Sequence, residues 1–127
     1  MKRLVTLIAI VLPVFAQEEA KFSQTMKDIA SASTQVKKAL DAKTSQEDVA
    51  NGGQKLETLY KDVELFFTKR GMADAVEITK TGQAAAKELG TPSGADAQAA
   101  LGRLNGTCKT CHAAHREKLP EGGYKIK

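Results

Sequence analysis

Residues 106–119 read GTCKTCHAAHREKL and contain both cysteines of the chain, three positions apart, with His112 directly after the second. Cysteines at this spacing allow three interpretations: a disulfide or redox pair, a metal clip, or a covalent anchor for haem. Alanine, lysine, glutamate, leucine and glutamine are plentiful in the chain, which favours helix. Both thiols would then project from one helix face, because positions i and i+3 are neighbours on a helix.

The residues CKTCH at 108–112 match C-x-x-C-H, the attachment motif of c-type haem. Thiols at i and i+3 can reach the two vinyl groups on one edge of a porphyrin, and the imidazole of the next residue then projects at the iron. We therefore expect one covalent haem c, with thioether bonds from Cys108 and Cys111 and with His112 as the proximal axial ligand.

The competing interpretations fit this segment less well. A thioredoxin-like pair places C-x-x-C at the start of a helix that follows a strand, and no strand is predicted before Cys108. A structural zinc ion needs four ligands around it. The available ligands crowd into eight residues of one predicted helix: Cys108, Cys111, His112 and His115.

Three further helices are predicted upstream, where apolar residues recur at helical spacing between clear breakers. Ser45 and Asp48 form a capping-box-like start for the second helix, and Gly90 with Pro92 ends the third. Ser93 and Asp96 open the fourth. The predicted helices are 18–42, 45–70, 72–89 and 93–118, and the tail after Pro120 has no helical character.

Four amphipathic helices with short loops predict an all-α fold, an antiparallel up-down-up-down four-helix bundle. A three-helix bundle with a frayed third segment is the alternative. Gly52 and Gly53 lie in the first turns of the second helix, so its start is expected to be ragged or later. Gly102 and Gly106 weaken the fourth helix, and close approach of a macrocycle would explain them.

The segment 1–16, MKRLVTLIAIVLPVFA, has the composition of a secretory signal peptide. Residues 2–3 form a charged n-region, residues 4–11 an apolar h-region, and residues 14–16 a small-residue cleavage site. A membrane anchor is the weaker alternative, because the apolar run is too short to span a bilayer. We expect export to the periplasm and a mature haem domain of residues 17–127.

The charge gives little guidance to partners. The chain has 19 basic and 15 acidic residues, a net charge of +4, and loss of Lys2 and Arg3 with the signal peptide would leave +2. No basic stripe with interleaved aromatic residues is present, so nucleic-acid binding has no support.

A C-x-x-C-H motif in the last of four predicted helices resembles the cytochrome c′ family, class II c-type cytochromes with haem near the C-terminus of an antiparallel bundle. The specific resemblance covers only residues 106–116. It implies that Arg116 lies near the proximal imidazole or the haem, although a helix-end arginine that serves only solubility is the alternative. His115 departs from the family, which usually has Tyr or Phe there, and is expected beside the ligand histidine or at the surface.

The family contains two kinds of haem site. In its low-spin members a methionine of the first helix is the sixth ligand, whereas in five-coordinate members an apolar residue covers that face of the iron. Met26 lies between Phe22 and Ile29 on the apolar stripe of the first predicted helix, near the position that the resemblance assigns to this residue. Met26 is the candidate sixth ligand and Phe22 and Ile29 the candidate pocket residues, with ordinary core packing as the alternative.

Two functions follow from these two sites. We expect a soluble electron carrier with His/Met ligation and a redox partner protein; the alternative is a five-coordinate cytochrome c′ that binds nitric oxide or carbon monoxide. Enzyme activity is not expected, because no distal histidine or acid–base pair is visible that could cleave a peroxide bond. The resemblance also allows a homodimer through the first two helices, although no decisive apolar patch is apparent.

Overall fold

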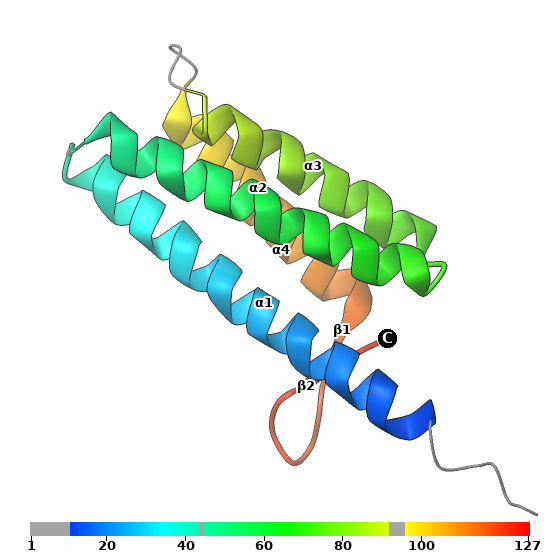
Figure 1. Cartoon of the computed structure of the whole chain (residues 1–127). Coiled ribbons are helices and arrows are strands. Elements are labelled where there is room, and N and C mark those ends of the chain that lie inside the picture. Colours follow the sequence, from blue (N-terminus) through cyan, green and yellow to red (C-terminus); the bar gives the residue numbers. More distant parts are fainter. Residues whose placement is uncertain (1–10, 44, 92–95) are drawn as a thin grey trace, which may run out of the picture.

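Four α-helices make up most of the computed structural model, which describes residues 11–43, 45–91 and 96–127 (Figure 1). Short connections join successive helices, and each helix packs on the next, so neighbours run antiparallel. The predicted up-down-up-down four-helix bundle is confirmed, and the three-helix alternative is wrong. The helices are α1 (Val11–Asp41), α2 (Gln46–Lys69), α3 (Ala73–Leu89) and α4 (Ala97–His115).

The first helix begins earlier than predicted. It starts at Val11 rather than at residue 18 and continues without a break past Ala16. Residues 1–10, the larger part of the expected signal peptide, lie outside the described residues, so cleavage after Ala16 stays a prediction. No helix in the described parts of the chain has both the length and the apolarity needed to cross a membrane.

Side-chain caps set the starts of α2 and α4. The Ser45 Oγ accepts a hydrogen bond of 3.1 Å from the Glu47 backbone N–H, which confirms the predicted start of α2. The Asp96 Oδ1 accepts one of 3.2 Å from the Ala99 N–H at the start of α4. Ser93, which was predicted to help open α4, lies outside the described residues.

The prediction of a ragged start for α2 is wrong, because the helix is regular through Gly52 and Gly53. A Cβ on Gly53 would lie 2.3 Å from the backbone N of Gly90 and 2.6 Å from the carbonyl C of Leu89. A Cβ on Gly52 would lie 2.3 Å from the Cγ2 of Val36 in α1. The two glycines therefore let α2 approach both neighbouring helices, and this packing offsets their low helix propensity.

The fourth helix ends at His115, three residues before its predicted end at 118. Arg116 is extended, with φ −124° and ψ 129°, and starts a two-stranded antiparallel hairpin of β1 (Arg116–Lys118) and β2 (Tyr124–Ile126). The backbone N–H of Lys127 donates to the His115 carbonyl over 3.0 Å. Pairing with the end of the chain thus replaces the last predicted helical turn, and the tail after Pro120 is confirmed as non-helical.

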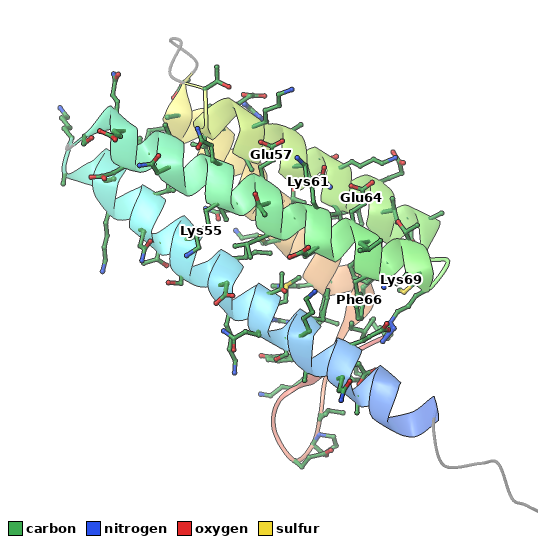
Figure 2. All side chains as sticks on the ribbon, viewed as in Figure 1. Lys55, Glu57, Lys61, Glu64, Phe66 and Lys69 are labelled. Carbon is green, nitrogen blue, oxygen red and sulfur yellow. The ribbon has the colours of Figure 1, made fainter. Side chains whose placement is uncertain are left out.

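The core lies between the helices, and some helix pairs pack more closely than others. Small residues dominate on α3, where Ala75, Ala85 and Ala86 are buried, so α3 packs closely on both α2 and α4. In contrast, α1 and α4 approach each other at few residues, and Figure 1 shows α1 diverging from α2 toward the N-terminal end of α1. On its outer side α2 is charged, with Lys61 Nζ and Glu57 Oε1 3.3 Å apart (Figure 2).

Candidate functional site

The residues of the C-x-x-C-H motif lie together on the partly buried side of α4. Cys108 and Cys111 are free thiols, half-buried, and both pack against the hydrophobic core. His112 is also half-buried. At 3.6 residues per turn, the three side chains leave the helix within an arc of about 100°. The structure therefore brings the predicted thiols and the predicted proximal ligand to one face.

The protonation states of this face suit ligation by nitrogen rather than by thiolate. Burial, and then the nearby Arg116 guanidinium, lower the pKa of His112, so its imidazole is neutral at pH 7 and has a free lone pair. Burial, and then the charges of Cys108 and Asp74, raise the pKa of the Cys111 thiol, which keeps it protonated.

A tyrosine that the sequence did not single out is hydrogen-bonded to the motif. The Tyr60 hydroxyl of α2 lies 3.1 Å from the Cys108 sulfur, and Tyr60 is only 5% exposed. Burial, and then the neighbouring Cys108 and Cys111, raise the pKa of Tyr60 well above its usual range. A tyrosine on an apolar stripe signals a buried hydroxyl that needs a partner, but the sequence does not say which partner.

The helices α2 and α4 run parallel on opposite sides of the core. Tyr60 meets Cys108, and seven residues further along both helices the Phe67 ring lies 5.9 Å from the His115 ring. Position 60 of α2 is therefore level with position 108 of α4, and position 67 with position 115.

Three phenylalanines form an aromatic cluster between α1 and α2, level with the end of α4. Phe22 stacks on Phe66 with ring centroids 4.1 Å apart and meets Phe67 edge-on at 5.6 Å. Phe66 projects from α2 toward α1 (Figure 2). The predicted pocket residue Phe22 thus belongs to this cluster, whereas the other, Ile29, is buried in the core at 4% exposure.

Met26 lies at the height of the C-x-x-C-H motif. Phe22 contacts Phe67, which contacts His115, so Phe22 of α1 is level with His115 of α4. Met26 follows Phe22 by one helical turn, and α1 runs antiparallel to α4, so Met26 is about level with Cys111, one turn before His115. Met26 is half-buried and packs against the same core cluster as Cys111. Another methionine, Met72, is half-buried at the N-cap of α3.

His115 is buried rather than at the surface, at 9% exposure. Its Nε2 lies 2.8 Å from the Asp74 carboxylate in the first turn of α3, and its Nδ1 lies 3.2 Å from the main-chain oxygen of Lys127. Desolvation raises the pKa of Asp74, but hydrogen bonds from the Ala75 N–H and from His115 lower it, and the net effect is a lowered pKa. His115 therefore ties α4 to α3 and to the hairpin.

Arg116 lies near His112, as predicted, and its guanidinium packs on a tyrosine of the hairpin. Its guanidinium is 3.9 Å above the Tyr124 ring, on the neighbouring strand, and remains close enough to lower the pKa of His112. Gly102 and Gly106 are exposed, and a Cβ on either would meet nothing within 4 Å. Around the axis of α4, both glycines lie more than about 100° from Cys108 and Cys111. The structure therefore does not support their predicted contact with a macrocycle.

Two surface hollows lie between α1 and α2, and none of the C-x-x-C-H residues lines either of them. One lies beside Lys55 and the other beside Phe66 and Lys69 (Figure 2). Among the described residues, no group of three or more His, Cys, Asp or Glu side chains could hold a metal ion. Two thiols beside one neutral imidazole are instead the groups that covalent attachment of haem requires, because the thiols would bind the porphyrin and the imidazole would bind its iron.

Comparison of the chain with protein-family models, curated proteins and solved structures gave no match.

Proposed function

We propose that the chain is an exported mono-haem c-type cytochrome of the cytochrome c′ class and that it carries electrons. One observation supports this most directly: Cys108, Cys111 and His112 lie on one half-buried face in the last helix of a four-helix bundle. A solvent-exposed helix does not require two thiols and an imidazole on its half-buried face, whereas a prosthetic group attached at the core does.

Each residue has a distinct part in this proposal. The thiols of Cys108 and Cys111 hold haem through thioether bonds, and the neutral His112 is the proximal ligand. When bound, the haem supplies an iron that exchanges one electron. Met26, at about the height of Cys111, is the sixth ligand, and thioether ligation raises the reduction potential. The aromatic cluster excludes water from the end of the site nearest His115.

A second candidate is a five-coordinate cytochrome c′ that binds nitric oxide or carbon monoxide. The stacking of Phe22 on Phe66 at 4.1 Å favours it, because a rigid apolar wall one turn from Met26 could cover an iron that has no sixth ligand. In this case Met26 and Ile29 are apolar neighbours of the gas rather than ligands.

The test is the absorption spectrum of the full chain from a host that attaches haem, recorded oxidised and reduced, with and without carbon monoxide. The electron carrier requires a low-spin spectrum without response to carbon monoxide, and Met26→Ala should become high-spin while the matched control Met72→Ala does not. A high-spin spectrum that shifts with carbon monoxide would instead establish the gas-binding protein. Absence of haem after denaturation would refute both candidates.

Cell fractionation of the same host tests export. Haem-containing protein that begins at Gln17 in the periplasmic fraction is the expected result. A full-length chain that stays in the cytoplasm would contradict the signal peptide.

A further inference from the structure

The two thiols of the motif are held differently, although they are close in sequence and on one face. The Cys108 sulfur is 3.1 Å from the Tyr60 hydroxyl. Among the described residues, the Cys111 sulfur has no hydrogen-bond partner. A helix alone would present both thiols in the same way, so the difference comes from the tertiary contact with α2.

The Tyr60 ring packs against Gly82 of α3. A Cβ on Gly82 would lie 2.6 Å from the Cε1 atom of Tyr60 and 3.0 Å from Cδ1 and Cζ. Any larger residue at position 82 would therefore displace the ring. The next residue, Gln83, donates its side-chain amide to the Tyr60 backbone carbonyl over 3.4 Å and also to Glu64, so α3 restrains both the ring and the backbone of Tyr60.

The chemistry of the pair indicates which atom is the donor. A phenol is a strong hydrogen-bond donor, whereas a thiol is a weak donor and a weak acceptor. The Tyr60 hydroxyl stays protonated at pH 7, because the pKa of an ordinary tyrosine is already about 10 and burial raises that of Tyr60 further. A sulfur in a thioether has no proton, so after attachment of haem only the tyrosine could donate.

We infer that Tyr60 is a positioning residue for the Cys108 sulfur: its hydroxyl donates a hydrogen bond to that sulfur and selects one side-chain rotamer of Cys108. For the free thiol the inference stands on the contacts alone. For the attached sulfur it rests on the proposed function, where the same bond would hold one of the two anchors of the haem edge.

The first experiment uses the full chain without haem, so its outcome does not depend on haem attachment. Nuclear magnetic resonance measures the exchange of the Tyr60 hydroxyl proton and the Hα–Hβ couplings that report the Cys108 rotamer. Tyr60→Phe keeps the ring and removes the donor. Tyr124→Phe makes the same change at a tyrosine that is 55% exposed, and is the matched control. Circular dichroism verifies that each variant is folded.

One net hydrogen bond corresponds to about a fivefold change in these equilibria. Tyr60→Phe should reduce the preference of Cys108 for its main rotamer by about fivefold and leave Cys111 unchanged, and Tyr124→Phe should change neither. Cys108→Ala should accelerate exchange of the Tyr60 hydroxyl by about fivefold, whereas the control Cys111→Ala should not. An unchanged Cys108 rotamer in Tyr60→Phe, or unchanged exchange in Cys108→Ala, would overturn the inference.

A crystal structure of the haem-loaded protein tests the attached state. The Tyr60 oxygen should lie within about 3.5 Å of the Cys108 sulfur, and a separation beyond about 4 Å would refute the second half of the inference. A chain that carries no covalent haem would refute the proposed function instead, while the measurements on the haem-free chain would still decide the role of Tyr60.

Discussion

Replacing Gly53 by alanine tests whether α2 and α3 pack backbone to backbone. The new Cβ would lie 2.3 Å from the Gly90 nitrogen, 2.6 Å from the Leu89 carbonyl carbon and 2.8 Å from the Leu89 Cβ. Two of these three atoms belong to the backbone of α3 and its C-cap, so no flexible side chain can move aside. The two helices have to separate locally, which also loosens the packing on either side of the contact.

The expected loss follows from two opposing effects. Overpacking a tight interior site costs about 1–3 kcal/mol, and the backbone contacts place this site near the upper value. Alanine in place of glycine inside a helix returns about 1 kcal/mol of helix propensity. The free energy of unfolding should therefore fall by about 2 kcal/mol, a large part of the roughly 5–15 kcal/mol that stabilises a typical domain.

Gly102→Ala is the matched control. It makes the same substitution inside α4, where the position is exposed and a Cβ would meet nothing within 4 Å. Only the propensity effect remains, so the free energy of unfolding should rise by about 0.5–1 kcal/mol. The two substitutions should thus have opposite signs.

Urea unfolding followed by circular dichroism, with all chains in the same haem state, measures both values. A Gly53→Ala variant at least as stable as the wild type would refute the close approach of α2 and α3. A Gly102→Ala variant that loses stability would show that a side chain at position 102 meets other atoms, contrary to the open space in the structure.

Two further predictions concern the end of the bundle near His115. Desolvation raises the pKa of Asp74, but hydrogen bonds from the Ala75 N–H and from His115 together outweigh it and lower the pKa below its ordinary 3.8. The carboxylate therefore contributes stability above about pH 4 that is lost as the pH falls through the lower folded value. Unfolding measured from pH 7 down to pH 2 should show a smaller acid-induced loss in Asp74→Asn, and an equal loss would contradict a stabilising contact. Phe22→Ala removes a half-buried ring stacked on Phe66 and should cost about 2 kcal/mol, less than the roughly 3–5 kcal/mol of a fully buried phenylalanine. The control Leu65→Ala, at a side chain 54% exposed, should change stability by no more than about 0.5 kcal/mol, and equal losses in urea unfolding would show that the aromatic cluster is not packed as described.

Several features of the fold and site could be predicted from the sequence because they depend on nearby residues. Helical spacing of apolar residues and a serine before α2 indicate helices and their starts, since these signals act within one or two turns. The placement of Cys108, Cys111 and His112 on one face follows in the same way from the geometry of a single helix. Their assignment to haem is a chemical interpretation of that local pattern.

Other features depend on contacts between distant segments, which local signals do not contain. Gly53 looked like a weakness in α2 until its contact with the C-terminal end of α3 explained it. The last predicted turn of α4 was lost because the end of the chain bonds to His115, a competition that helix propensity does not describe.

The sequence alone therefore determined four helices and the placement of Cys108, Cys111 and His112 on one helix face, because periodicity and spacing act along a single helix. Only the tertiary structure decided that Tyr60 meets Cys108 and that Asp74 meets His115, pairs separated by 48 and 41 residues. Such partners are chosen by how the helices pack, and a buried hydroxyl or imidazole bonds to whichever polar group that packing brings within reach.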